Sequence, residues 1–366
     1  MTAAAERKCR RLIASLRKKH PAAEIILTGC ISGKIPEAAA SGVRIVAQPE
    51  KMRIADWIAG AHVAPEEPSI SDFAGHSRAF VKVQDGCDNY CAYCVIPFMR
   101  GAPRSRPAAA VIAEIRRLAA RGFQEIVLTG INLGAWGSDC VPRQSLSFLL
   151  ARVAEAVRVP RLRLSSLEPD ALSGELAGII AGNRMFCRHL HIPLQSGDDE
   201  ILGRMNRRYT LRDYLRRIEQ ARRRIPEVSF TTDVIVGFPG EEQRQFRNTL
   251  RAVEAAGFLR VHIFPFSPRP RTAAADMPRR VPAAEITARR QELAACAAAA
   301  GFRYRAGMEN RNFLVLFETA RQGTWSGYTD TYVPVRVRAA QALRNRLLPV
   351  RISTVSASAT CGELLE

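Results

Sequence analysis

The middle of the chain alternates short apolar runs with amphipathic stretches, and this pattern predicts its elements. Near-continuous apolar runs are typical of strands in a parallel sheet, and amphipathic stretches between them are typical of covering helices. We expect strands at Arg78–Val83, Glu125–Leu128, Arg161–Leu164, His189–Ile192, Ser229–Val236 and Arg260–Phe264. We expect helices between them, such as Ala108–Ala120, Ser145–Val157 and Leu211–Arg223. The predicted fold class is therefore α/β.

Six such strand and helix units predict a partial (β/α)6 barrel. In parallel barrels the reactive groups lie at the carboxyl ends of the strands. Unusual residues follow the predicted strands at these ends, namely Cys87, Gly130–Asn132, Ser165–Glu168, Gln195–Gly197 and Gly237–Glu241. We therefore expect the chemistry of this chain at that edge of the sheet.

The segment before the barrel predicts a small α/β unit over residues 5–60. A helix carries Leu12, Ile13 and Leu16 on one face, and a strand, Glu24–Thr28, leads into Gly29 and Cys30. The stretch from 62 to 76 contains proline and glycine, shows no period, and is typical of a linker. A domain boundary near residue 70 follows.

The end of the chain predicts a small β-barrel after a helix over Ala283–Ala300. Strand-like runs occur at Phe313–Phe317 and Leu347–Ile352, with a turn-rich aromatic segment between them. The aromatic residues Trp325, Tyr328 and Tyr332 suit stacking on single-stranded RNA, and a packed-core role is equally compatible with the sequence. The predicted domains are 1–66, 77–300 and 301–366.

The charge of the chain indicates the class of molecule that it binds. The 366-residue chain carries 54 Lys and Arg against 35 Asp and Glu, a formal charge of +19, and nearly all of its basic residues are arginine. Arginine forks onto phosphate and stacks on bases, which favours RNA, although a codon bias toward arginine is an alternative cause of the arginine excess. No apolar run is long enough to span a membrane, and the first residues lack the apolar core of a signal peptide. We expect a cytoplasmic protein that binds neither membrane nor DNA.

The candidate chemistry begins in a loop with three cysteines, Cys87, Cys91 and Cys94, directly after the first barrel strand. Three thiolates on one loop can hold three irons of a [4Fe-4S] cluster and leave the fourth iron open for a non-protein ligand. A structural zinc site is the alternative, but zinc needs a fourth protein ligand, and no fourth cysteine follows within the loop.

The residues around this loop resemble the AdoMet radical enzymes, and among them the tRNA methylthiotransferases. The resemblance extends over nearly the whole chain and is closest to the branch acting on threonylcarbamoyladenosine at tRNA position 37. It rests on Cys87–Arg106, Leu128–Gly134, Ser165–Pro169, His189–Gly197, Met205–Thr210, Thr231–Glu241 and Phe264–Arg269. The last module resembles the TRAM domain, which is the RNA-binding end of that family.

The resemblance implies a specific reaction, the transfer of a methylthio group to carbon 2 of the adenine. One S-adenosylmethionine would methylate a sulfur on an auxiliary [4Fe-4S] cluster. A second would be cleaved reductively at the cluster of the three-cysteine loop, and the resulting radical would take the hydrogen from the base.

The implied partners are a tRNA anticodon stem-loop and a reductant such as flavodoxin or ferredoxin. The implied AdoMet contacts, chosen by strand-end position, are Gly130, Asn132, Glu168 and Gln195. A helix N-terminal acid is the alternative role for Glu168.

The N-terminal domain departs from the family pattern. The family holds its auxiliary cluster with three separated cysteines, and here only Cys30 matches, so the resemblance implies a truncated domain and a doubtful second cluster. A start site placed too late and a true short form are the two explanations. Alternative functions are a sister methylthiotransferase acting on isopentenyladenosine tRNA or a ribosomal protein, and a non-catalytic iron-sulfur protein that binds RNA.

Overall fold

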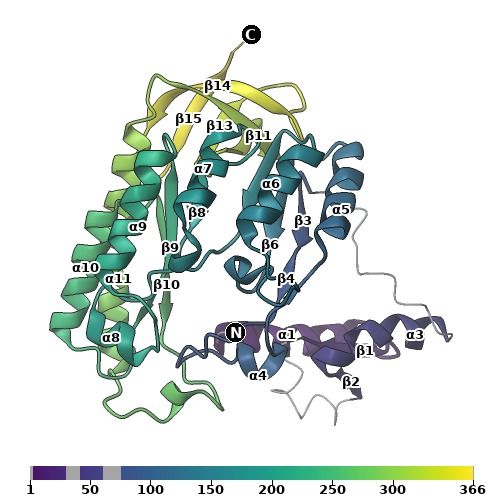
Figure 1. The fold of residues 1–366 in the computed structure, drawn as a ribbon, viewed down its shortest axis with the longest axis vertical. Coiled ribbons are helices and arrows are strands. Elements are labelled where there is room, and N and C mark those ends of the chain that lie inside the picture. Colours follow the sequence, from purple (N-terminus) through teal and green to yellow (C-terminus); the bar gives the residue numbers. More distant parts are fainter. Residues whose placement is uncertain (1–2, 30–41, 61–75, 366) are drawn as a thin grey trace. The chain divides into compact units, whose positions relative to one another are not determined.

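The computed structural model describes residues 3–29, 42–60 and 76–365 (Figure 1). The chain divides into two compact units, which are described separately. Unit 1 comprises Met1–Pro68, Gly86–Ala102 and Ser267–Ala275, and unit 2 comprises Ser69–Asp85, Pro103–Phe266 and Asp276–Glu366. The predicted linker falls almost entirely on residues 61–75, outside the described residues.

Six parallel strands form the core of unit 2, as the sequence predicts. They are β3 (Arg78–Lys82), β6 (Glu125–Thr129), β7 (Arg161–Leu164), β8 (His189–His191), β9 (Ser229–Val236) and β10 (Arg260–Pro265). The sheets β3-β6-β7 and β8-β9-β10 are joined by isolated bridges from Leu162 to Phe186 and from Ser166 to His191. A short antiparallel ribbon, β4 (Gln84–Asp85) with β5 (Arg104–Ser105), follows the first strand. The parallel order is that of the predicted partial barrel.

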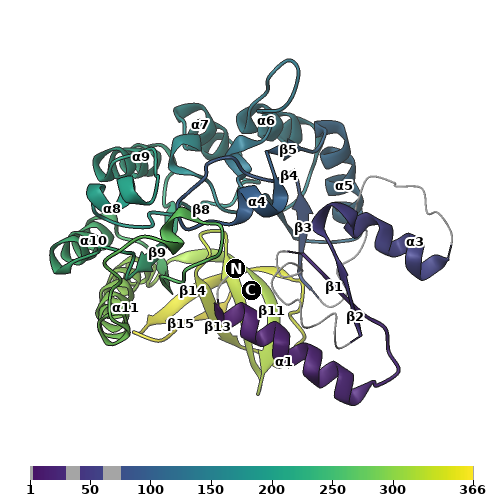
Figure 2. The ribbon, with the colours of Figure 1, turned by 90° about the horizontal axis from the view of Figure 1, so that it is seen from below.

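Helices cover the outer face of these strands (Figure 2). They are α5 (Ala108–Ala120), α6 (Leu146–Ala156), α7 (Gly174–Gly182), α8 (Asp199–Arg204), α9 (Leu211–Arg224), α10 (Gln243–Ala256) and α11 (Ala283–Ala306), with short turns η2 (Leu133–Ala135) and η3 (Pro169–Ala171). Ser145 and Thr210 cap α6 and α9 by accepting hydrogen bonds from backbone N–H groups of the first turn, which fixes where these helices begin.

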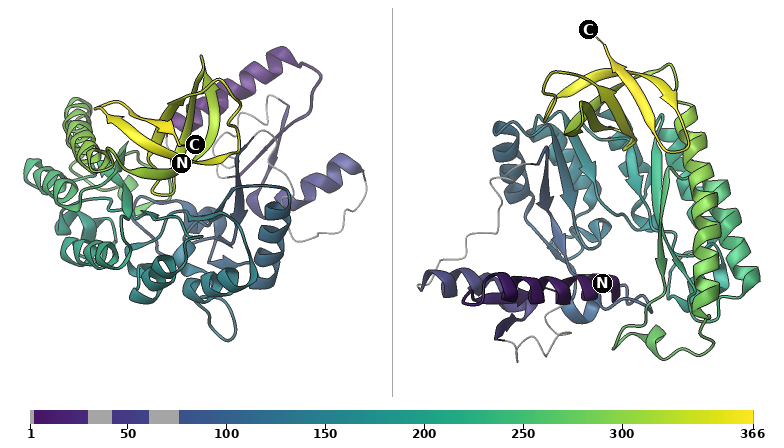
Figure 3. Two further views of the ribbon diagram at one scale, coloured as in Figure 1. Left: turned by 90° about the horizontal axis from the view of Figure 1, so that it is seen from above. Right: turned by 180° about the vertical axis from the view of Figure 1, so that it is seen from behind.

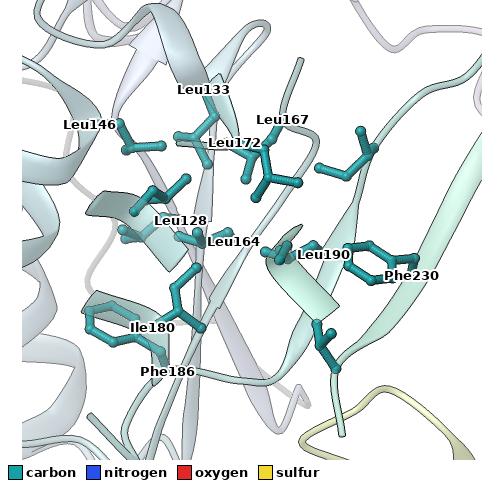
Figure 4. Packing of buried hydrophobic residues seen from close by; sticks show 14 of the residues in the cluster. Leu128, Leu133, Leu146, Leu164, Leu167, Leu172, Ile180, Phe186, Leu190 and Phe230 are labelled. Carbon is teal, nitrogen blue, oxygen red and sulfur yellow. The ribbon is translucent and has the colours of Figure 1, made fainter. Parts of the chain in front are cut away.

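The hydrophobic core lies between the strands and the helices (Figure 4). Alternate strand residues such as Leu128, Leu164, Leu190 and Phe230 belong to this core. Because successive side chains of a strand point to opposite faces, the residues between them form a second face, away from the helices. That second face is largely polar, and it carries most of the features discussed below.

Helix α11 extends six residues beyond the predicted end at Ala300. The sequence suggested a break at Gly301, but this glycine is helical and buried. A Cβ at position 301 would lie 2.5 Å from the carbonyl oxygen of Leu259, so the glycine allows close packing of α11 on the chain that enters β10.

A closed five-stranded barrel follows α11, as predicted (Figure 3). Its strands are β11 (Asn312–Arg321), β12 (Thr324–Thr329), β13 (Pro334–Arg338), β14 (Leu347–Val355) and β15 (Thr360–Leu364). The segment expected to be turn-rich is largely strand β12. The aromatic residues have packing partners: Trp325 packs against the barrel core, and Tyr328 stacks on Tyr332 at 5.0 Å. These contacts favour the packed-core interpretation of the aromatic residues.

The C-terminal barrel docks on the amino ends of the core strands through a buried ionic cluster. Arg163 donates to Glu125 at 2.7 and 3.1 Å and also donates to the carbonyl oxygens of Thr329 and Asp330. Arg161 donates to the carbonyl oxygen of Tyr328 at 2.9 Å. Burial alone would raise the pKa of Glu125, but the charge and hydrogen bonds of Arg163, together with the charges of Arg161 and Arg78, hold that pKa below its ordinary value. Glu125 is therefore ionised.

Unit 1 contains a small α/β element that agrees with the sequence prediction. It comprises α1 (Ala3–Lys19), β1 (Ile25–Thr28), β2 (Val43–Val46), η1 (Gln48–Arg53) and α3 (Ile54–Ala59), with β1 and β2 parallel. Of the predicted apolar face of α1, Ile13 packs against Leu27 and Val43, whereas Leu12 and Leu16 are exposed. Unit 1 also holds α4 (Ile96–Arg100) and η4 (Ala273–Ala275).

Among the helices of the described ranges, none combines the length and apolar character needed to cross a membrane.

Candidate functional site

The three-cysteine loop lies in unit 1, and backbone hydrogen bonds fix its two ends. The N–H of Cys87 donates to the carbonyl of Gly101 at 2.9 Å, and the N–H of Cys94 donates to the carbonyl of Cys91 at 2.9 Å. All three cysteines are half-buried. Three thiols at partial exposure on one ordered loop are a donor set that fits an iron-sulfur cluster, which needs thiolates reachable from solvent during assembly.

The loop is also held by packing from the segment Ser267–Ala275. The N–H of Ala274 donates to the carbonyl of Ala92 at 2.8 Å, next to the half-buried Tyr93. The guanidinium of Arg271 lies 5.2 Å from the ring centre of Phe98, and Tyr90 meets the same ring edge-on at 6.0 Å. The conformation of the three-cysteine loop is therefore stabilised by contacts that could not be predicted from the sequence.

Gly86 is required where the loop begins. Its φ is +79°, and a Cβ at this position would lie 2.8 Å from the carbonyl oxygen of Gly101. We predict that Gly86→Ala distorts the loop and lowers the iron retained after anaerobic reconstitution several-fold, because both the backbone conformation and the space exclude a side chain. Iron analysis measures this. Gly122→Ala is the matched control, since Gly122 also has a positive φ but no neighbour within 4 Å. Equal iron in both variants would contradict the prediction.

Two of the four predicted AdoMet contacts, Gly130 and Asn132, follow β6 in unit 2, and both lie against the side chain of Gln84. The side-chain oxygen of Gln84 accepts a hydrogen bond from the backbone N–H of Asn132 at 2.9 Å. The same oxygen would lie 3.1 Å from a Cβ at position 130. The side-chain oxygen Oδ1 of Asn132 is buried and has no hydrogen-bond partner among the described residues. A buried amide oxygen without a partner is costly, so it marks a place where a ligand donor fits.

Asn132→Ala is therefore expected to weaken AdoMet binding without destabilising the protein. Removing an unpaired buried oxygen costs the fold little, whereas losing one hydrogen bond to the ligand raises the dissociation constant about tenfold. Equilibrium binding of AdoMet and thermal melting measure the two effects. A lower melting temperature with unchanged AdoMet affinity would show that the oxygen serves the fold.

Glu168 follows β7, and its partner is Arg207. Arg207 donates to both carboxylate oxygens of Glu168 and lies over the ring of Tyr209, 4.9 Å from its centre. Glu168 precedes η3 and makes no capping hydrogen bond there. The ion pair orders the carboxylate but uses part of its hydrogen-bonding capacity.

Gln195 follows β8 in an unusual backbone conformation, with φ of +64°. Its N–H donates to the carbonyl of Asp233 and its carbonyl accepts from the N–H of Ile235, at 2.8 and 2.9 Å. No hydrogen bond joins Gln195, Glu168 and Asn132 to one another among the described residues. The structure therefore places three predicted contacts at three strand ends without linking them. Cys30 lies outside the described residues.

The segment Gly237–Glu241 has a structural role. The N–H of Gly237 donates to Glu241 at 2.7 Å, and Arg289 of α11 bonds to the same buried carboxylate at 2.9 Å. A Cβ at position 237 would clash with Ile286. Gly237 therefore allows close packing of this turn on α11.

Several polar residues of the site were not predicted from the sequence. Gln84 lies in the short ribbon strand β4, and Arg207 lies in the loop between α8 and α9. The others are His191, Asp233 and His262 on three core strands, whose ligating atoms all lie within 4.8 Å of one another. A signal was available, because polar residues alternate with apolar ones in β8 and β9, whereas fully buried parallel strands are apolar on both faces.

Comparison with known proteins identifies the class first. Residues 81–253 match the model of the radical SAM superfamily. The cobalamin-dependent AdoMet radical enzyme OxsB shares the fold, with a TM-score of 0.50 and 11% identity over 74% of this chain and 44% of OxsB. The chain is thus an AdoMet radical enzyme, and such enzymes use a [4Fe-4S] cluster and AdoMet.

The relatives in sequence are more specific. A threonylcarbamoyladenosine tRNA methylthiotransferase of Chlamydia pneumoniae is 37% identical, covering 100% of this chain and 87% of the relative. One from Thermotoga maritima is 38% identical over 91% of this chain and 80% of the relative. A tRNA-2-methylthio-N(6)-dimethylallyladenosine synthase of Syntrophotalea carbinolica is 44% identical, but the match covers only 56% of this chain and 46% of the relative. The chain belongs to the threonylcarbamoyladenosine tRNA methylthiotransferase family.

Proposed function

We propose that this enzyme transfers a methylthio group to carbon 2 of threonylcarbamoyladenosine at position 37 of tRNA. The observation that carries the proposal is the identity of 37% to such an enzyme over the whole chain, which includes the three-cysteine loop and every strand end. The relative that acts on dimethylallyladenosine has higher identity, but only over about half of the chain.

In this proposal Cys87, Cys91 and Cys94 would hold the [4Fe-4S] cluster, which would pass an electron from the reductant to AdoMet. Asn132 accepts a hydrogen bond from AdoMet through its buried Oδ1, and Gly130 leaves space beside Gln84. Glu168, oriented by Arg207, accepts from hydroxyl or ammonium donors of AdoMet, as carboxylates do at other nucleotide sites. Gln195 is the fourth proposed AdoMet contact, and its backbone is held in place by hydrogen bonds to Asp233 and Ile235. Cys30 remains the proposed ligand of an auxiliary cluster.

The RNA partner is proposed to be a tRNA anticodon stem-loop, since a base in a single-stranded loop leaves its stack at low cost. The C-terminal barrel is proposed to be a TRAM-like domain over 301–366, following a radical core over 77–300 and an N-terminal domain over 1–66. Its strands and turns expose several arginines to solvent: Arg321, Arg336, Arg338, Arg344, Arg346 and Arg351. Exposed arginines favour a polyanionic ligand. A flavodoxin or ferredoxin is the proposed reductant.

Mass analysis of tRNA nucleosides tests the substrate. The chain is expressed in a bacterial strain that lacks its own methylthiotransferase for threonylcarbamoyladenosine. We expect methylthio-threonylcarbamoyladenosine to appear with the wild-type chain and not with a Cys94→Ala variant. Methylthio-isopentenyladenosine instead would assign the sister activity. Absence of any methylthio nucleoside, with normal protein levels and a loaded cluster, would contradict the proposal.

A further inference from the structure

Three side chains on neighbouring strands of unit 2 form a polar cluster that the proposed function does not use. His191 ends β8, Asp233 lies in the middle of β9, and His262 lies in β10. In the sheet register Asp233 stands opposite His262, and Thr231 stands opposite His191. All three belong to the face of the sheet away from the helices, because their strand neighbours Leu190, Val234 and Ile263 pack into the helix-covered core.

The distances within the cluster suit a bound cation. The ring atom Nε2 of His191 lies 3.3 Å from Oδ1 of Asp233. Two ligand atoms bound tetrahedrally at about 2.0–2.1 Å from zinc stand about 3.4 Å apart. The rings of His191 and His262 are 5.8 Å apart between centres. Two imidazoles on one zinc ion have ring centres about 5 Å apart. A small side-chain rotation of the exposed His262 therefore brings all three ligands within reach of one ion.

The other nitrogen of His191 already has the partner that a metal-binding histidine needs. Its Nδ1 lies 2.9 Å from the hydroxyl of Thr231, and that hydroxyl lies 2.9 Å from Nε2 of His189. When Nε2 of His191 binds a cation, Nδ1 carries the proton and donates it to Thr231, whose hydroxyl then donates to His189. No hydrogen bond of this chain is lost, and ligating histidines are held by such outer partners.

We propose that His191, Asp233 and His262 bind one divalent transition-metal ion, such as zinc or ferrous iron. Two imidazoles and one carboxylate match the preferences of these ions and disfavour calcium and magnesium, which take oxygen ligands. Three protein ligands leave at least one coordination position for water or for a nitrogen or oxygen atom of a bound molecule. The site uses none of the cysteines, and it does not depend on the proposed tRNA substrate.

Zinc binding to the cluster-loaded protein tests the site. Protein whose iron-sulfur cluster has been reconstituted anaerobically is titrated with zinc chloride in a calorimeter, and the zinc-loaded sample is studied by X-ray absorption. We expect one zinc per chain, with nitrogen or oxygen neighbours at about 2.0–2.1 Å and no sulfur at about 2.3 Å. His262→Gln and Asp233→Asn are expected to weaken binding at least 100-fold, and His20→Gln, an exposed histidine outside the cluster, to leave it unchanged.

Thr231→Val provides a second variant that keeps all three ligands. We expect a 10- to 100-fold loss of zinc affinity, because the outer partner of His191 is removed. Sulfur neighbours around the zinc would overturn the proposal, as would equal zinc affinity in wild type, His262→Gln and Asp233→Asn. Loss of AdoMet or RNA binding in these variants, without any zinc binding by the wild type, would assign the cluster to direct ligand hydrogen bonding instead and would also overturn it.

Discussion

Replacing Cys91 by alanine is expected to reduce cluster iron from about four atoms per chain to near none and to abolish reductive cleavage of AdoMet. Three cysteines are the minimum that holds a cubane with one open iron, and Cys87, Cys91 and Cys94 share one loop fixed by the Gly101 carbonyl. Two remaining thiolates leave two irons without protein ligands. Iron analysis and the formation of 5'-deoxyadenosine under strong reductant measure the loss.

Cys140→Ala is the matched control, since Cys140 is equally half-buried but isolated in sequence from the loop. It should keep the wild-type iron content. Retention of four irons and of AdoMet cleavage by Cys91→Ala would exclude this loop as the cluster site. A wild-type value near eight irons would instead show that the chain holds a second cluster.

Glu125→Gln is expected to destabilise unit 2 by about 3–5 kcal/mol, because it leaves buried arginines without their counter-charge. Glu125 is fully buried, and Arg163 and Arg161, both within 4 Å of its carboxylate, are almost fully buried too. Urea unfolding followed by tryptophan fluorescence measures the change. The exposed Glu219→Gln, which loses two surface ion pairs on α9, should leave the midpoint nearly unchanged. Equal midpoints for both variants would show that the ionic cluster does not stabilise the protein.

The same carboxylate predicts a pH dependence. Burial acts to raise the pKa of Glu125, but Arg163, Arg161 and Arg78 together hold it below its ordinary value of 4.5. A carboxylate whose pKa is lowered in the folded state stabilises the protein at pH values above its ordinary pKa. This stabilisation is lost as the pH falls through the pKa of the folded state. The stability difference between wild type and Glu125→Gln should therefore be constant above about pH 5 and shrink in more acidic solution. A difference that grows on acidification would contradict this sign.

The strand pattern was predictable because each core strand has an apolar face toward the helices. Arg78–Lys82 and Ser229–Val236 were found within a residue of expectation. The end of α11 was not predictable, because Gly301 lies inside the helix and allows its close approach to Leu259, which is a tertiary contact. The ionic cluster was likewise hidden, since the alternation of Arg161 and Arg163 with leucines indicates a polar face but not what covers it.

The candidate site was predictable to different depths. The spacing of the three cysteines, together with the residues around them, nominated the cluster loop, because a set of thiols on one loop is a local feature of the sequence. The pairing of Glu168 with Arg207 and the unpaired oxygen of Asn132 depend on which loops the fold brings together, so sequence position nominated the residues but not their hydrogen bonds. The cluster of His191, Asp233 and His262 comes from three strands and required the sheet register.

AdoMet cleavage by the purified, anaerobically reconstituted protein, in the presence of reductant and tRNA, tests most directly whether this chain is a radical enzyme for threonylcarbamoyladenosine tRNA. We predict 5'-deoxyadenosine from the wild type, stimulated by tRNA that carries threonylcarbamoyladenosine and not by the same tRNA lacking that modification. A protein with a fully loaded cluster that forms no 5'-deoxyadenosine with either tRNA would contradict this prediction.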